Sequence, residues 1–496
     1  MRESGILLPI SSLPSQYGIG CFSKEAYEFV DQLALANQKY WQILPLGPTS
    51  YGDSPYQSFS TYAGNPYFID LNTLIEEGVL TKKECDLADF GSDSRFIDYG
   101  KLYKARYKLL RKAYERSNIS QNPEFRTFQE ENAWWLDDYA LFMAIKGFFQ
   151  DECWDKWPED IKKRYGYALD YYREQLYFEI EFQKYMQFEF SIQWKKLKTY
   201  ANENGIRIIG DIPIYVAYDS ADTWAHPELF QLDEENVPLA VAGCPPDGFA
   251  ADGQLWGNPL YRWDYHRRTG YTWWMQRLSY AFYLYDVVRI DHFRGFDEYF
   301  SIPYGDTTAR NGHWEKGPGI ELFHRMKEVL GERDVIAEDL GYVTDSVRQM
   351  VFESGFPGMK VFEFAFDSRD TGCAGDYLPH NYPINSVVYT GTHDNATLIG
   401  WYQDIPKEGR EMLRDYIHDY TTSDRSLHWS VICRVMGSPA RICMIPMQDY
   451  LGLNNPCRIN TPSTLGTNWK WRLLDGEFTS DLQNKIKKLV RIYQRN

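Results

Sequence analysis

Eight short apolar segments rich in Val, Ile, Leu and aromatic residues recur along the chain, and most are separated by stretches with helical spacing. Apolar runs bounded by turn residues predict buried strands, and their alternation with helices predicts parallel pairing. Because eight such units close a (β/α)8 TIM barrel, we predict an α/β fold of that class. The predicted strands are residues 5–10, 40–46, 206–214, 287–293, 334–340, 359–366, 386–394 and 441–447.

Helices are predicted between or after these strands, at residues 23–38, 315–331, 344–355 and 481–494. The last of them is basic and amphipathic and follows the eighth strand, where it would seal the barrel. Only a loop and this helix follow that strand, so no separate C-terminal β-domain is expected.

The strands are unevenly spaced, which predicts insertions into the barrel. Far more residues separate the second strand from the third than one crossover helix needs, so we interpret 47–205 as an inserted, mostly helical subdomain. A second insertion at 219–262 is rich in Gly and Pro and is expected to be loop-rich. The predicted organisation is one catalytic barrel over 1–496 that carries both inserted subdomains.

Charge and composition narrow the function classes. The chain has 53 Lys and Arg against 69 Asp and Glu, a formal charge of −16, which disfavours nucleic acid as the partner. No apolar stretch is long enough to span a membrane, and the apolar run near the N-terminus is broken by Pro9, so a cytoplasmic protein without a membrane partner is expected. The eight cysteines form no Cys-x-x-Cys pair, which argues against a zinc ribbon or a disulfide framework.

Aromatic residues make up 17% of the chain although its mean hydropathy is −0.51. We therefore expect some rings to face solvent or ligand rather than the core. Aromatic faces suit sugar rings, which present a flat apolar C–H surface while their hydroxyls need hydrogen bonds at the edges.

Carboxylates are placed at the ends of several predicted strands. Asp211 closes the third strand, Asp291 the fourth, Glu338 the fifth, and His393-Asp394 the seventh. The carboxyl ends of barrel strands form the active-site face, so these acids are expected to converge there. Since a cluster of like charges is costly, a functional role is the better interpretation.

Two carboxyl groups facing a sugar acetal are the minimum needed for glycoside chemistry. Arg289 lies two residues before Asp291, on the same face of a strand, so its guanidinium can keep that carboxylate ionised as a nucleophile. Glu338 suits the proton donor, because like charges should raise its pKa. Asp394 can bind hydroxyls of the distorted sugar ring, and His393 can donate a hydrogen bond. The alternative is that Arg289 and Asp291 form only a structural ion pair of the barrel.

Other chemistries are less well supported. His292, His393 and nearby acids could ligate a divalent ion, but no His-x-His or His-Glu-x-x-His spacing occurs, and no metal or cofactor is expected. A Gly-x-Ser-x-Gly elbow and a phosphate-binding Gly-x-x-x-x-Gly-Lys-Ser/Thr motif are also absent from the sequence.

Six motifs, in order and over the whole chain, resemble the amylomaltase family, the 4-alpha-glucanotransferases related to the α-amylases. They are GDSPYQSFSTYAGNPYFIDL (52–71), GDIPIYVA (210–217), PPDGFAADGQLWGNPLY (245–261), RIDHFRGF (289–296), AEDLG (337–341) and TGTHDN (390–395). Gly248 departs from the family pattern, because many relatives have a bulkier residue at this position. The loop 245–255 is therefore expected to cover substrate less firmly.

The resemblance implies a role for each matching residue. Asp291 would be the nucleophile, Glu338 the general acid/base and Asp394 the stabiliser of the transition state. Residues 459–472 resemble the mobile loop of the family, and Asn460 within them would contact sugar. The resemblance implies seven substrate-binding residues in all, namely Ser54, Tyr56, Asp211, Trp256, Arg289, His393 and Asn460.

The expected function is transfer of α-1,4-glucan segments between glucan or maltooligosaccharide chains by a retaining double displacement. Two alternatives stay open at this point: an α-1,4-glucan hydrolase of the α-amylase type, which could use the same acids, and a non-catalytic glucan-binding protein. The oligomeric state is left open by the sequence.

Overall fold

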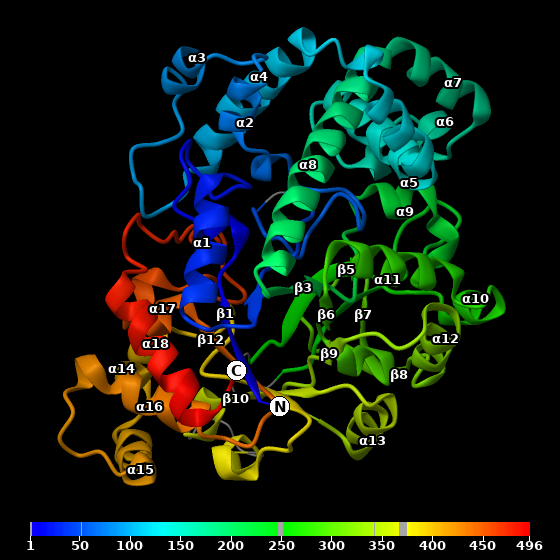
Figure 1. Ribbon diagram of the computed structural model, residues 1–496. Coiled ribbons are helices and arrows are strands. Elements are labelled where there is room, and N and C mark those ends of the chain that lie inside the picture. The colour runs from blue at the N-terminus through cyan, green and yellow to red at the C-terminus, as the bar shows by residue number, and fades with distance from the viewer. Residues whose placement is uncertain (1, 51, 247–250, 342, 367–373) are drawn as a thin grey trace.

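The computed structural model describes residues 2–50, 52–246, 251–341, 343–366 and 374–496, and its centre is a closed barrel of eight parallel strands (Figure 1). In the order of pairing the strands are β1 (Glu3–Leu7), β12 (Ile442–Pro446), β11 (Ser386–Tyr389), β10 (Gly358–Val361), β9 (Val335–Ala337), β6 (Val287–Ile290), β3 (Arg207–Ile212) and β2 (Tyr40–Gln42). A strand lies within or overlaps each of the eight predicted ranges, which confirms the barrel class, but each strand ends earlier than predicted. Residues Phe362–Ala365, for example, form a 3-10 helix and not the end of a strand.

The barrel strands are almost wholly buried, because helices cover the outer face and side chains fill the inside. Polar groups inside the barrel find partners there: the buried Tyr389 hydroxyl donates to Gln42 Oε1 at 2.8 Å. On β3, a Cβ at Gly210 would lie 2.1 Å from the Tyr285 ring, so only glycine fits beside this ring.

Helices surround the barrel (Figure 1). They are α1 (Lys24–Leu35), α11 (Thr272–Leu284), α12 (Glu321–Leu330), α13 (Asp345–Ser354), α14 (Leu398–Asp404), α15 (Lys407–Ile417), α16 (Leu427–Met436) and α18 (Ser480–Tyr493). The C-terminal helix α18 packs against α1 and α16, and so lies over the junction of the first and last strands, as predicted. The short helix α17 (Met447–Leu451) begins directly after β12.

A helical region follows β2 and rises above the barrel (Figure 1). Its helices are α2 (Leu71–Glu76), α3 (Lys82–Asp86), α4 (Tyr99–Arg116), α5 (Pro123–Phe148), α6 (Glu159–Lys162), α7 (Gly166–Gln175) and α8 (Tyr177–Glu203). Asn122 caps α5 by accepting from the Glu124 N–H at 2.8 Å, with proline at the first helical position. Helix α8 ends at Asn204 and Gly205, and the positive φ of 74° at Gly205 explains the stop.

A second, antiparallel sheet was not predicted. It has the order β5-β4-β7-β8 and uses β4 (Ala240–Cys244), β5 (Gln254–Pro259), β7 (Glu298–Pro303) and β8 (His313–Lys316). The segment 219–262, expected to be loop-rich, thus contains two of these strands as well as α9 (Ala221–Ala225), and α10 (Trp263–Arg268) follows it. The predicted helix 315–331 was wrong at its start, because 313–316 pairs with β7 and Gly319 has a positive φ of 63° just before α12.

Among the described residues, the helices are each too short or too polar to cross a lipid bilayer.

Candidate active site

An arginine between two aspartates forms the base of the candidate site. Asp211 on β3 and Arg289 on β6 are register partners, so both side chains point into the barrel. Arg289 Nη1 donates to both oxygens of Asp211, at 2.8 and 2.7 Å, and to Asp291 Oδ1 at 3.1 Å. The Asp211 and Arg289 side chains are buried, whereas 27% of the Asp291 side chain is exposed. Of the two aspartates, Asp291 is therefore the one that a ligand can reach.

Asp291 directly follows β6, and its backbone N–H donates to Ile212 O at 3.0 Å. Burial raises the pKa of Asp291 to about 6, Arg289 opposes this rise, and the nearby carboxylates of Asp211 and Asp394 add to it. The Arg289 guanidinium thus lowers the pKa of Asp291, in the direction expected from the sequence, but the pKa of Asp291 stays above its ordinary value.

Glu338 directly follows β9 and is held by two backbone donors. Its Oε2 accepts from the His292 N–H at 2.7 Å, and its Oε1 accepts from the Leu340 N–H at 2.9 Å. Burial raises the pKa of Glu338 to about 8, Arg289 opposes the rise, and the Asp291 carboxylate adds to it. The two neighbouring carboxyls therefore favour opposite states near neutral pH, with Asp291 ionised and Glu338 protonated.

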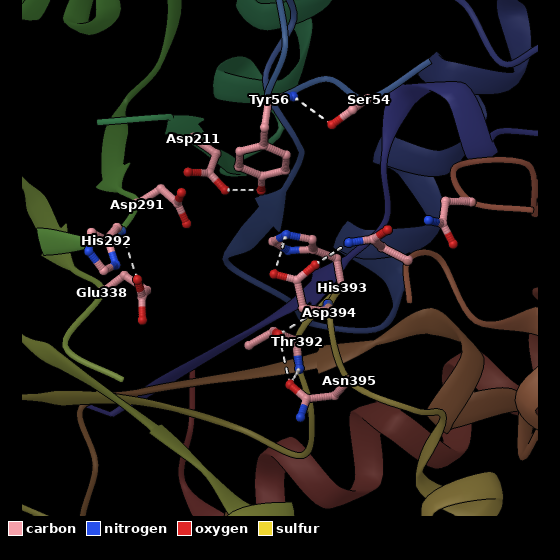
Figure 2. Close-up of polar contacts among 12 residues, drawn as sticks. Ser54, Tyr56, Asp211, Asp291, His292, Glu338, Thr392, His393, Asp394 and Asn395 are labelled. Atoms are coloured by element: carbon pink, nitrogen blue, oxygen red, sulfur yellow. Dashed lines mark hydrogen bonds and ion pairs between the residues drawn. The ribbon is translucent and has the colours of Figure 1, made fainter. Parts of the chain in front are cut away.

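The loop after β11 brings His393 and Asp394 to the opposite side of the site (Figure 2). His393 Nε2 lies 3.3 Å from Asp394 Oδ2, and Asn460 Nδ2 donates to Asp394 Oδ1 at 2.6 Å. Burial favours the neutral acid, but His393 and Asn460 outweigh it and lower the pKa of Asp394 to about 2. Burial also disfavours the His393 imidazolium, but Asp394 raises the pKa of this histidine above its ordinary value. Asp394 is thus a permanent carboxylate.

Tyr56 links the two sides of the site. Its hydroxyl donates to Asp211 Oδ2 at 2.7 Å, and its ring stacks on the His393 ring with centroids 5.1 Å apart and an interplanar angle of 13° (Figure 2). Ser54 lies beside it and accepts from the Tyr56 N–H at 3.3 Å. Ser54 therefore supports the backbone that carries Tyr56.

Trp256 lies on β5 of the second sheet, and its ring meets the His292 ring edge to face at 4.9 Å. This contact places Trp256 next to the strand ends that carry Asp291 and Glu338. Gly248, from the same motif, lies outside the described residues.

Two contributors were missed in the sequence. His292 was considered only as a metal ligand, yet its left-handed backbone (φ 49°) aims its N–H at Glu338. Trp469, in the loop 459–472, packs against Tyr56 and His393 with centroids 5.9 and 6.0 Å away. The tryptophan was inside a motif that the sequence singled out, but only the folded chain shows its neighbours. In the described part of the chain, no group of three or more His, Cys, Asp or Glu side chains is arranged to hold a metal ion.

The fold and the site define the class of protein: a (β/α)8-barrel with a cluster of acids of opposed protonation at the carboxyl ends of its strands. Residues 8–477 match the family described as 4-alpha-glucanotransferase, and the chain belongs to that family.

Similar proteins cover the whole chain. The 4-alpha-glucanotransferase of Clostridium butyricum is 50% identical over 98% of this chain and 99% of its own, and that of Thermus thermophilus is 45% identical over 100% of this chain and 99% of its own. Among solved structures, the amylomaltase of Streptococcus agalactiae in complex with acarbose matches with a TM-score of 0.96 and 41% identity over the full length of both chains.

Proposed function

We propose that this protein transfers α-1,4-glucan segments between maltooligosaccharide or glucan chains by a retaining double displacement. The observation that carries the proposal is the placement of three acids around one site: Asp291 is paired with Arg289, Glu338 is held beside it by the His292 N–H, and Asp394 lies opposite, held by Asn460 (Figure 2). Burial raises the pKa of Asp291 and of Glu338, whereas His393 and Asn460 lower that of Asp394, which suits a nucleophile, a proton donor and a stabilising carboxylate. The family membership and the names of the relatives support the same reaction.

In the first step, Asp291 attacks the anomeric carbon of the donor glucan. The C–O bond to the reducing-side portion breaks, and Glu338 gives its proton to the leaving oxygen. A glycosyl ester on Asp291 results, with inverted configuration at the anomeric carbon. In a retaining enzyme the two carboxyl groups lie about 5–5.5 Å apart, which is the spacing we expect for Asp291 and Glu338.

In the second step, Glu338 is a carboxylate and takes the proton from the 4-hydroxyl of an acceptor glucan. The acceptor oxygen attacks the anomeric carbon, the ester to Asp291 breaks, and the second inversion restores the α-1,4 bond. Asp394 carries negative charge throughout, so it opposes the positive charge that develops on the sugar ring and binds ring hydroxyls.

The other predicted residues are assigned to binding. Arg289 supports the nucleophile, Tyr56 offers its ring to the donor glucose, and His393 donates to a sugar hydroxyl near the cleaved bond. The resemblance implied the same hydroxyl-binding role for Asp211, but its buried side chain already accepts from Arg289 and Tyr56, so we propose that Asp211 acts by holding these two residues. Trp256 is assigned to the acceptor side and Asn460 to a sugar contact, while Ser54 is a substrate-binding residue close to Tyr56.

Incubation with maltotriose and chromatography of the products tests the function. Transfer gives glucose together with longer maltooligosaccharides, and the number of reducing ends stays constant. Hydrolysis would raise the number of reducing ends with every bond cleaved, and that result would favour the α-amylase-type alternative. No turnover at all would leave only glucan binding.

A further inference from the structure

A buried aspartate behind the site touches both ends of the loop that carries Asp394. Strands β11 and β12 are neighbours in the barrel, with Tyr389 opposite Met444, so the segments that leave these strands lie side by side. Asp449 belongs to α17, directly after β12, and is 1% exposed. It therefore lies behind the loop, where substrate does not reach it.

The two oxygens of Asp449 accept from different ends of the loop. Oδ2 accepts from the Thr390 hydroxyl at 2.5 Å, directly after β11, and Oδ1 accepts from the Leu398 N–H at 2.8 Å, at the start of α14. The residues between these two donors, 391–397, include His393 and Asp394. A single carboxylate thus fixes the distance between the points where the loop begins and ends.

Contacts inside the loop pass this constraint to Asp394. Asn395 Oδ1 accepts from both the N–H and the hydroxyl of Thr392, at 2.9 and 2.8 Å, and the Asp394 N–H donates to Thr392 Oγ1 at 3.2 Å (Figure 2). On the opposite side, Asn460 holds the Asp394 carboxylate. Arg458 Nη2 also donates to Asp394 O at 2.5 Å, and the Asn460 N–H donates to His393 O at 3.1 Å. The middle of the loop is thus held by the segment after β12, and its two ends are held by Asp449.

We propose that Asp449 is a positioning residue for the reaction: it holds Thr390 and Leu398 so that the loop between them keeps Asp394 at the sugar ring. This inference rests on the role proposed for Asp394. It predicts that breaking one tether displaces that carboxylate while the fold persists.

Thr390→Val tests the tether, because valine has nearly the shape of threonine but lacks the hydroxyl that Asp449 accepts. Displacement of a reacting group by about 1 Å lowers rates by about 100-fold, so we expect kcat to fall about 10- to 100-fold with a smaller change in KM. Thr390→Ser keeps the hydroxyl and should restore most of the rate. Thr223→Val is the matched control, since it removes another buried hydroxyl bond, from Thr223 to Tyr218 O, on α9 and not on the loop that carries Asp394. Its kcat per folded molecule should equal that of the wild type.

A double-mutant cycle separates positioning from general loss of stability. Fluoride release from maltotriosyl fluoride is measured for the wild type, Thr390→Val, Asp394→Asn and the double variant. If the tether acts through Asp394, Thr390→Val should cost little further rate once Asp394 is replaced. Equal fold losses in both backgrounds, or a normal kcat in Thr390→Val, would overturn the proposal. Fluoride release measures bond cleavage in both transfer and hydrolysis. A wild type that only hydrolyses would therefore contradict the proposed function, while the double-mutant cycle would still test the role of Asp449.

Discussion

The pH dependence of kcat/KM should show two carboxyl groups that act in opposite states. Asp291 must be ionised to attack, so activity is lost as the pH falls through its pKa of about 6. Glu338 must be protonated to assist the leaving group, so activity is lost as the pH rises through its pKa of about 8. We therefore expect a bell-shaped profile with its maximum at about pH 7.

The size of the effect follows from these two values. At about pH 7, between the two pKa values, most of the Asp291 groups are ionised and most of the Glu338 groups are protonated. At about pH 5 or about pH 9, one of the two groups is in its reactive state in only about a tenth of the molecules, so kcat/KM should fall about tenfold on each side.

The assay is the initial rate of glucose release from maltotriose at constant ionic strength. Glu338→Gln is the diagnostic variant, assayed with maltotriosyl fluoride, whose leaving group needs no proton. Its first step should lose the alkaline limb and keep the acid limb. A flat wild-type profile, or an alkaline limb that persists in Glu338→Gln, would refute the assignment of the acid.

Three further predictions concern stability, rate and the choice of acceptor. Arg289→Met leaves the buried Asp211 carboxylate without its cation and should lower the free energy of unfolding, measured in urea, by about 3–5 kcal/mol. The control Arg310→Met breaks an exposed ion pair and should lower it by about 0–1 kcal/mol, so equal losses would contradict the buried network. Asn460→Ala removes a hydrogen bond to a charged group worth about 1.5–3 kcal/mol and should lower kcat/KM for maltotriose about 10- to 100-fold, with an unchanged rate as the contrary result. Trp256→Ala should raise the ratio of hydrolysis to transfer, measured as reducing ends per bond cleaved, and an unchanged ratio would remove Trp256 from acceptor binding.

The barrel could be predicted because its strands are buried on both faces and therefore appear as continuous apolar runs. The start of α5 at Asn122 and the end of α8 at Asn204-Gly205 also follow from local chemistry, since Asn can cap a helix start and Gly adopts the backbone that ends a helix. The second sheet was not predictable in this way, because β8 is half exposed and β5 contains a glycine with φ of 78° at 257. Its two local pairs, β4 with β5 and β7 with β8, are joined into one sheet by β4 and β7, which are distant in the sequence. The inserted subdomain bounds, 47–205 and 219–262, stay predictions.

The acids of the site were predictable because strand ends meet at one face of a barrel, whatever the loops between them do. The contacts of Asn460, Trp469 and Asp449 depend on how the segments after β12 fold back over those ends. No local pattern specifies such contacts, since each joins residues brought together by tertiary structure. The sequence therefore predicted the candidate reacting groups, and the structure adds the residues that contact them.

In the proposed mechanism, Asp291 forms a covalent bond with the donor sugar while Glu338 and Asp394 act on the same ring. Glu338→Gln incubated with maltotriosyl fluoride should accumulate the glycosyl-enzyme, since no base remains to activate the acceptor. Proteolysis and mass spectrometry should then find a maltotriosyl group on the peptide that contains Asp291. A label on another carboxylate, or continued turnover without any labelled peptide, would contradict the assignment.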